Sequence, residues 1–435
     1  MRPIKQDLIP GTEERGTTPR AVSDAFDPTR LTQARRLAEM TKKDVAAQLG
    51  VTPAAVGQYE TGVSRPRPDL IPRLAEILGV PVTFFLLGRP ANRLDASMAH
   101  FRSLRSTPKS QRERALAFAE QVWELTYALE QRIQLPLVDL PGFAGGEVHP
   151  GEELSTDPAS AARELRRRWG LGDGPVTHLV RRMESHGIVV VMPPASDPSA
   201  ASVDAFSTRA ARPLVVLTAN RADGIYRHRF TAAHELGNLV LHGDATGDSR
   251  QEKEADAFAA EFLTPQDSIL PLLPRRMDLA RLAELRGVWG VSLHSRVYRC
   301  RELGLISDAT ASRTYQRLRA LDGQPGFTAE SVSNFPGERP SLLGQAFDLA
   351  AREAGLSDSR LAHELAWTSE RVQNLLGVQE QKPVLRLVQQ PSPIDLRSRR
   401  RGSLPDLRQV LPTSTRRQAS GASKAMNSHR TPQAR

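Results

Sequence analysis

A histidine and a glutamate stand side by side at His234 and Glu235, in a segment whose apolar residues recur at helical spacing. In helices that hold a catalytic zinc ion, two histidines at positions i and i+4 share one face. The glutamate after the first histidine then acts as general base. Here the residue four positions after His234 is Asn238. The first ligand and the base are therefore present, while an amide replaces the second ligand.

This replacement bears directly on metal binding. Zinc prefers cysteine, histidine and carboxylate donors, and catalytic sites usually hold it with three of them plus a water. The amide oxygen of Asn238 is neutral and a poor donor. His242 lies eight residues after His234, about 12 Å along a continuous helix, too far to share one ion. Only a helix break near Gly237 would bring it closer, so we expect zinc binding to be weak or absent.

The flanking segments resemble the ImmA/IrrE family of metallopeptidase-like proteins, from about Ala161 to about Tyr315. The most similar stretches are RPLVVLTANRADGIYRHRFTAAHELGNLVLH and QEKEADAFAAEFLTP. The resemblance implies a strand, the helix of His234 and Glu235, and a downstream helix that supplies a third metal ligand. Glu252 matches that ligand best, and Glu254 is the alternative register. The resemblance also connects the chain with proteins in which this domain follows a DNA-binding domain.

Three interpretations of this segment remain open. In the first, the domain is a pseudo-enzyme that senses a signal or forms a dimer, and Glu235 has no activated water to act on. In the second, it is a weak zinc endopeptidase that cleaves a repressor protein, with water or another group replacing the missing ligand. In the third, His234 and Glu235 are ordinary helix residues. We favour the first interpretation.

Residues 41–59 have the spacing of two short helices joined by a tight turn. Thr41 is placed to cap the first helix, and Gly50 stands where the turn needs a positive φ. The second helix begins at Thr52 and has proline in its first turn, where the missing N–H costs nothing. The residues expected to face inward are Ala46, Val51, Val56 and Tyr59. This spacing suits a second helix laid in the major groove; a helical module that binds protein, or nothing, is the alternative.

The stretch from Leu31 to Leu86 resembles the XRE family of Cro-like helix-turn-helix regulators. The resemblance places Thr52, Ala54, Ala55 and Gln58 on the groove-facing helix. Gln58 would read adenine edges, and the threonine and alanine methyl groups would contact thymine methyl groups. The expected phosphate contacts are Lys42, Lys43, Arg65 and Arg67. Such a regulator is expected to bind operator DNA as a homodimer on a two-fold site, with a repressor or toxin protein as a further candidate partner.

The net charge of +10 is distributed unevenly. Residues 391–435 carry ten Lys/Arg and two Asp/Glu, which gives +8 and leaves only +2 for the rest of the chain. This basic tail is rich in Ser, Pro, Gln and Arg, and we expect it to be disordered. It either adds weak phosphate affinity or is a solvated end without a specific role.

The pattern as a whole predicts a multi-domain protein. We expect a flexible lead-in (1–26), an all-α helix-turn-helix domain (27–90), a helical connector and linker (91–157) and an α+β zincin-like domain (158–322). A helical block (341–377) and the basic tail (391–435) follow. The block has a faint helix-turn-helix rhythm but lacks the turn glycine and has few basic residues, so it is predicted to be a packing module.

Two further features bound the class of protein. No apolar run approaches the roughly 18 residues of a membrane span, and the first twenty residues lack the apolar core of a secretory signal. We therefore expect a cytoplasmic protein without membrane contact. Cys300 is the single cysteine, which excludes an internal disulfide framework and a cysteine-based metal cluster, and it is expected to be a buried thiol.

Overall fold

The computed structural model of the chain describes residues 18–86, 99–101, 108–141, 154–193, 205–209, 212–218, 224–242, 249–321 and 330–377. The predicted basic tail, residues 391–435, lies outside these described residues. Within them, no helix is long and apolar enough to cross a membrane.

The N-terminal domain is all-helical, as predicted. Its elements are α1 (Pro19–Asp24), α2 (Pro28–Leu37), α3 (Lys42–Leu49), α4 (Pro53–Thr61), α5 (Leu70–Leu78) and the 3-10 helix η1 (Val82–Phe85). The structure differs from the expected lead-in over residues 1–26, because α1 is capped by Thr18 and buries Val22 completely. Phe26 also pairs with Leu86, which joins the two ends of the domain.

The α3–α4 corner is built as its sequence indicates. Thr41 accepts a hydrogen bond from the backbone of Asp44, and the Asp44 carboxylate accepts one from the backbone of Thr41, which completes a capping box. Gly50 ends α3 with φ of 76°, a conformation that favours glycine. Thr52 is the N-cap of α4 rather than its first residue, and Pro53 takes the first position. The turn and both caps therefore fix the angle between the two helices.

Four three-residue strands form one mixed sheet in the order β1-β3-β4-β2. They are β1 (Ala99–Phe101), β2 (Val189–Val191), β3 (Phe206–Thr208) and β4 (Leu214–Val216). β2 pairs with β4 in parallel, and the other pairs are antiparallel. The valine-rich runs 188–192 and 213–217 are flanked by proline and turn residues and predict two strands, and β2 and β4 lie inside them. β1 and β3 were not predicted, because three residues of mixed polarity give no recognisable period.

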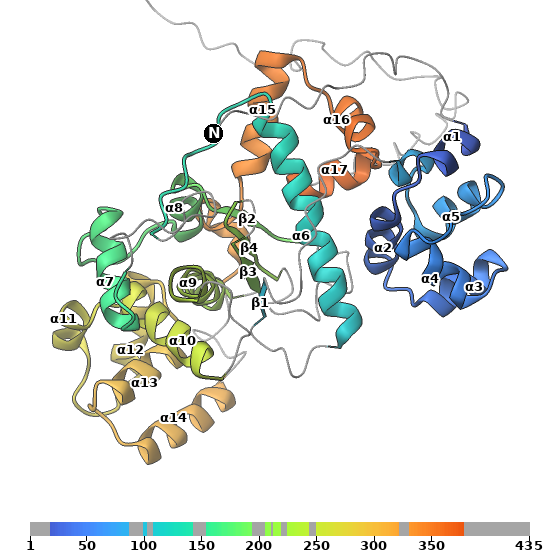
Figure 1. Cartoon of the computed structure of the whole chain (residues 1–435). Coiled ribbons are helices and arrows are strands. Elements are labelled where there is room, and N and C mark those ends of the chain that lie inside the picture. The colour runs from blue at the N-terminus through green and yellow to red at the C-terminus, as the bar shows by residue number, and fades with distance from the viewer. Residues whose placement is uncertain are drawn as a thin grey trace, which may run out of the picture. The chain divides into compact units, whose positions relative to one another are not determined.

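Helices cover both faces of the sheet, with α6 (Lys109–Glu130) on one side and α9 (Ile225–Leu241) on the other (Figure 1). Val189 and Val191 belong to the apolar cluster that contains α6 residues, and Val190 belongs to the cluster that contains α9 residues. Successive strand side chains point to opposite faces, so a sheet buried on both faces needs continuous apolar strands. The same alternation places the Ser207 side chain of β3 toward α9.

The remaining helices of the middle region are α7 (Pro158–Arg168), α8 (Leu179–Ser185), α10 (Ser249–Leu263), α11 (Gln266–Ile269), α12 (Leu279–Trp289), α13 (Leu293–Glu302) and α14 (Asp308–Leu321). Of these, α7, α8 and α10 pack against α9. Short 3-10 turns are η4 (Leu270–Leu272), η5 (Val332–Asn334) and η6 (Pro336–Glu338). Cys300 is completely buried, and burial raises the pKa of its thiol to about 11, so it stays protonated as an inert core residue.

The C-terminal block comprises α15 (Leu342–Ala354), α16 (Asp358–Leu365) and α17 (Ser369–Leu376). Its α16–α17 corner has the same construction as α3–α4: an eight-residue helix, one left-handed residue, one further residue and a threonine N-cap. Ala366 takes the left-handed position with φ of 49°, although the sequence has no glycine there. The faint helix-turn-helix pattern in the sequence therefore corresponds to two helices joined by a tight turn. This corner contacts α6 through the Arg371–Gln121 hydrogen bond and the segment directly after α6 through the Arg132–Glu364 hydrogen bond.

Candidate DNA-binding surface and candidate metal centre

The exposed side of α4 carries most of the residues expected to contact bases. Thr52, Ala54 and Gln58 are exposed, while Ala55 is half-buried and packs against the domain core. The Thr52 hydroxyl accepts a hydrogen bond of 3.2 Å from the Ala55 backbone N–H, so this residue also caps the helix. Three of the four predicted side chains therefore lie on one accessible surface, and Ala55 contributes less of its area.

The cations expected to contact phosphate surround this helix and are all exposed: Lys42, Lys43, Arg65 and Arg67. Three of them also bind within the domain. Lys42 Nζ lies 3.1 Å from a Glu60 carboxylate oxygen, Arg67 pairs with Asp69 at 3.2 Å, and Arg65 donates to a backbone carbonyl of α1. A phosphate would share these cations with their protein partners.

A buried ion pair holds α4 in place. Arg35 of α2 donates through Nε to Glu60 Oε1 at 2.5 Å and through Nη2 to Glu60 Oε2 at 3.3 Å. The Glu60 side chain is only 5% exposed. A charged pair in a protein interior is stabilising only when its geometry is good, and here the Arg35 guanidinium makes two hydrogen bonds to the Glu60 carboxylate. These two bonds fix the position of α4 relative to α2.

The residues of the candidate metal centre lie on α9, where His234 and Glu235 are fully buried and Asn238 nearly so. Glu235 accepts hydrogen bonds from the Ser207 hydroxyl of β3 at 2.8 Å and from the Asn238 amide at 3.3 Å. The candidate base is thus held between the sheet and its own helix.

His234 lies between two carboxylates of α10. Its Nδ1 is 2.8 Å from an Asp256 oxygen, a contact that in metal sites orients a ligating imidazole. Its Nε2 lies 3.5 Å from Glu252 Oε2. This nitrogen is buried and makes no hydrogen bond among the described residues. Two ligands of a tetrahedral zinc ion at bond lengths of about 2.1 Å are about 3.4 Å apart, so these two atoms have ligand-like spacing.

Asn238 occupies the position of the missing ligand, and both polar atoms of its amide are engaged. Its Nδ2 donates to Glu235, and its Oδ1 is 3.2 Å from His242 Nδ1. The other ring nitrogen of His242 is 3.0 Å from Glu254. Hydrogen bonds from Arg250 and then from His242 lower the pKa of the Glu254 carboxyl group. A polar chain therefore runs from Ser207 to Glu254 where a metal-ligand set would stand.

These residues do not fit a catalytic zinc site with three protein ligands. His234 and Glu252 supply two suitable metal donors. The third ligand position holds the Asn238 amide, which is hydrogen-bonded to Glu235 and His242. Within the described part of the chain, no group of three or more His, Cys, Asp or Glu side chains is arranged to hold a metal ion.

Packing between α9 and α10 sets this geometry. A Cβ atom at Gly237 would lie 2.9 Å from the Phe258 ring, so glycine allows the two helices to approach closely. The helix break near Gly237 that would bring His242 to the metal position does not occur, because α9 continues to Leu241. His242 then leaves the helix with extended backbone, which lets its ring reach back to Asn238.

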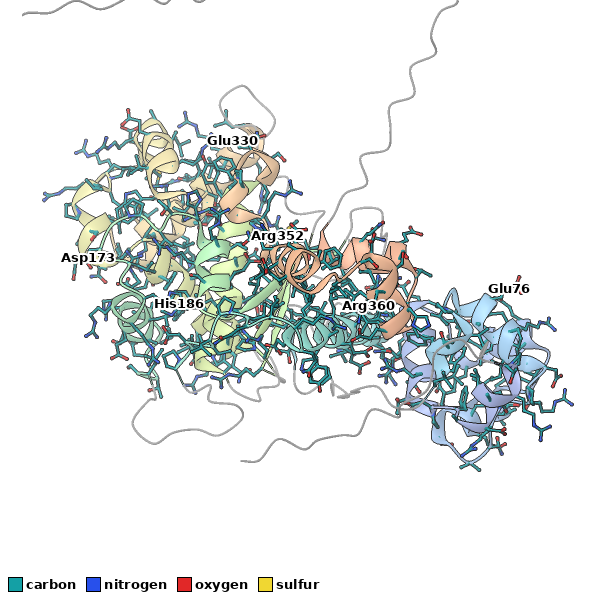
Figure 2. The ribbon with its side chains drawn as sticks, turned by 90° about the horizontal axis from the view of Figure 1, so that it is seen from above. Glu76, Asp173, His186, Glu330, Arg352 and Arg360 are labelled. Carbon is teal, nitrogen blue, oxygen red and sulfur yellow. The ribbon has the colours of Figure 1, made fainter. Side chains whose placement is uncertain are left out.

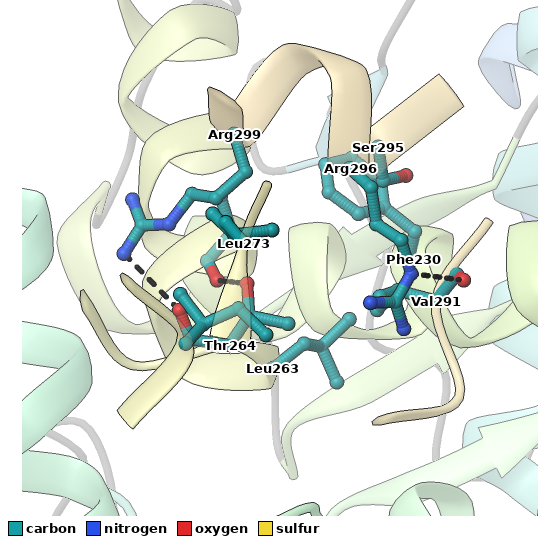
Figure 3. Close-up of a pocket in the computed structure, with 10 residues that line it drawn as sticks. Phe230, Leu263, Thr264, Leu273, Val291, Ser295, Arg296 and Arg299 are labelled. Carbon is teal, nitrogen blue, oxygen red and sulfur yellow. Dashed lines mark hydrogen bonds between the residues drawn. The ribbon is translucent and has the colours of Figure 1, made fainter. Parts of the chain in front are cut away.

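The far end of α10 is held by α13. Arg299 donates hydrogen bonds to Glu261 and to the Thr264 carbonyl. Figure 3 shows the bond to Thr264. Beside it, Arg296 donates to the Val291 carbonyl at 3.4 Å. Burial lowers the pKa of Arg296 to about 10, which still leaves it charged at neutral pH. These contacts fix the register of α10 and with it the positions of Glu252 and Asp256.

The sequence predicts the α9 residues and Glu252, and the structure brings Glu252, rather than Glu254, to His234. Asp256 was not predicted, although it stands four residues after Glu252 and therefore on the same helix face. Ser207 was not predicted either, because it belongs to a strand that the sequence pattern does not indicate.

Comparisons with known families agree with both halves of this description. Residues 31–85 match the helix-turn-helix family, and residues 183–301 match the IrrE N-terminal-like domain family. No curated protein matches the chain. The matches show an XRE-type helix-turn-helix domain of the DNA-binding regulator kind followed by an IrrE/ImmA-like, metallopeptidase-like domain, the fusion that the motifs predict.

Proposed function

We propose that this chain is a sequence-specific transcriptional regulator whose IrrE-like domain is a sensor or partner module without peptidase activity. The observation that carries the proposal is the state of Asn238. Its amide bridges Glu235 and His242 in a buried polar chain, at the position where a peptidase needs a second imidazole. A buried network with all of these hydrogen bonds stabilises the fold of the domain. It leaves zinc only two donors, His234 and Glu252.

The DNA-binding half of the proposal is supported by α4. Its exposed Gln58, Ala54 and Thr52 lie among the cations of the same domain, and a homodimer would present two such helices to a two-fold operator. An electrophoretic shift with genomic fragments at moderate salt tests it. Gln58→Ala should weaken binding to the selected operator by about 1–3 kcal/mol, while Glu76→Gln, on α5 of the same domain (Figure 2), should not. Equal binding to all fragments would contradict the proposal.

Zinc content tests the loss of peptidase activity. Purified protein should hold far less than one zinc per chain, and Asn238→His should raise the zinc content because it restores a third donor beside His234 and Glu252. The matched variant Asn374→His, on α17, should leave it unchanged. Near-stoichiometric zinc in the unaltered protein, lost in His234→Ala, would overturn the proposal.

The second candidate is a zinc endopeptidase that cleaves a repressor. Its support is the retained geometry of His234, oriented by Asp256 and 3.5 Å from Glu252, with Glu235 beside it. In that case zinc would supply an activated water, and Glu235 would take its proton. Co-purification of a repressor or toxin protein that stays intact would favour the partner-module role instead.

A further inference from the structure

A cavity of about 200 Å³ lies where α2, α5, α6 and the start of α17 meet. Two of these helices belong to the DNA-binding domain, and α17 belongs to the C-terminal block. Nothing in the proposed DNA contacts or in the polar chain of Asn238 uses this cavity. A void of about 150 Å³ is enough to hold a benzene molecule, so a small organic ligand fits.

One part of the cavity is apolar and formed by buried side chains. Phe84 is completely buried and Phe118 is 6% exposed, and both rings line the space. Such walls favour an apolar ligand body, because burial of its surface is the main source of affinity.

The polar part of the cavity is cationic. The guanidinium groups of Arg114 and Arg371 line it, and none of the described lining residues is acidic. Arg371 lies 5.3 Å above the Phe118 ring and donates to the neutral side-chain oxygen of Gln121. Arg114 pairs with Glu39 at 3.0 Å. Arg371 therefore places a positive charge directly beside the apolar wall.

A third feature points to a ligand. Trp367 lines the cavity and is only 5% exposed, yet its Nε1–H has no hydrogen-bond acceptor among the described residues. A buried donor without an acceptor is destabilising, and a bound acceptor would satisfy it. Thr368, the N-cap of α17, also lines the cavity, and a helix N-terminus favours an anion.

We propose that this cavity binds a small carboxylic acid with an aromatic or branched aliphatic body. The carboxylate pairs with Arg371 at the start of α17, and the apolar body lies against Phe84 and Phe118. A ligand held there contacts α2 and α5 of the DNA-binding domain and α17 of the C-terminal block at the same time. Its binding therefore changes operator affinity, a consequence that rests on the proposed DNA-binding function.

Binding is tested on the full chain without DNA. Benzoate and 4-methylpentanoate are titrated by calorimetry, with tryptophan fluorescence as a second readout because Trp367 lines the site. Both acids should bind saturably, and benzamide and 4-methylpentanamide should bind at least about tenfold more weakly because they lack the charge. No saturable binding by either acid, or equal binding of acids and amides, overturns the proposal.

Variants locate the site. Arg371→Gln should weaken acid binding at least about tenfold. Arg360→Gln, an exposed arginine of α16 (Figure 2), should leave it unchanged. Trp367→Phe removes the indole N–H and keeps the ring; it should weaken binding severalfold and serves as the test if Arg371→Gln does not fold. Equal loss in the Arg360 and Arg371 variants overturns the location.

The regulatory consequence has its own readout. Operator affinity is measured with and without saturating benzoate, in the unaltered chain and in Arg371→Gln. A change confined to the unaltered chain supports it, and acid binding that leaves operator affinity unchanged contradicts it. Failure to bind any operator would refute the proposed function, while the calorimetric result on the acid would stand.

Discussion

At the scale of single residues, the proposed function depends most on Asn238. Two carboxylates of the candidate site lie beside the His234 ring: Asp256 contacts its Nδ1, and Glu252 lies 3.5 Å from its Nε2. The amide turns this arrangement into a closed polar chain with Glu235 and His242. On the proposed function, this one side chain makes the difference between a metal centre and a structural network.

Thr52 has two roles that substitution can separate. Its hydroxyl caps α4, and on the proposed function its methyl group would contact a thymine methyl. Thr52→Ser should keep the stability of the domain and weaken operator binding. Thr52→Ala should lower the free energy of unfolding by about 1 kcal/mol through loss of the cap. Urea denaturation and operator titration of both variants measure the two effects, and equal stabilities would show that the cap contributes nothing.

Gly237 permits the close approach of α9 and α10. Gly237→Ala should lower the free energy of unfolding by about 1–3 kcal/mol, because the new Cβ would overlap the Phe258 ring, 2.9 Å away. Gly287 is a matched control in α12, since a Cβ there meets nothing within 4 Å. Gly287→Ala should be neutral or stabilising by up to about 1 kcal/mol. Chemical denaturation measures both, and similar values for the two would refute the packing argument.

At the scale of elements, α6 has a central position. One of its faces packs on the sheet with Val189 and Leu214, and other residues of the helix contact α2 and α17. This explains why α6 buries several polar side chains, among them Glu120, Gln121 and Glu124. Each of them bonds to a partner from another helix.

The Arg30–Glu124 pair joins α2 to α6 in the protein interior, with both side chains at most 2% exposed. Glu124→Ala should lower the free energy of unfolding by about 3 kcal/mol or more, because it leaves the Arg30 charge buried. Glu113→Ala, on the same helix, removes a half-exposed contact of 3.9 Å with Arg36 and should cost less than about 1 kcal/mol. Denaturation curves of both variants decide, and comparable losses would contradict this assignment.

At the scale of the whole molecule, acid should destabilise the fold through a buried histidine. His228 is 4% exposed and lies 2.8 Å from the Glu338 carbonyl, and burial lowers the pKa of its ring below the ordinary value of 6.5. As the pH falls below 6.5, the unfolded chain therefore binds a proton that the folded chain does not. The contribution to stability is fully present above that pH and is lost as the pH falls.

Denaturation midpoints at about pH 7.5 and about pH 5.5 test this effect. The unaltered chain should lose more stability between them than His228→Gln does. His363→Gln, which changes an exposed histidine of α16, should behave like the unaltered chain. Identical pH dependence in all three proteins would rule out His228 as a source.

The sequence by itself determined the features set by local chemistry. The Thr41 cap, the Gly50 turn, the strands β2 and β4 and the spacing of His234, Glu235 and Asn238 all depend on neighbours within a few residues. Backbone conformational preference and hydrogen bonding act over that range. For the same reason the helix-turn-helix could be predicted almost residue by residue.

Only the tertiary structure decided which distant groups meet. Ser207 reaches Glu235 because β3 lies against α9, and Asp256 reaches His234 because Gly237 lets α10 approach. The turn at Ala366 forms without glycine because its two helices are held by packing on α6. The cavity beside Arg371 needs four helices from both ends of the chain. Such contacts depend on close packing between segments far apart in sequence, which no local pattern encodes.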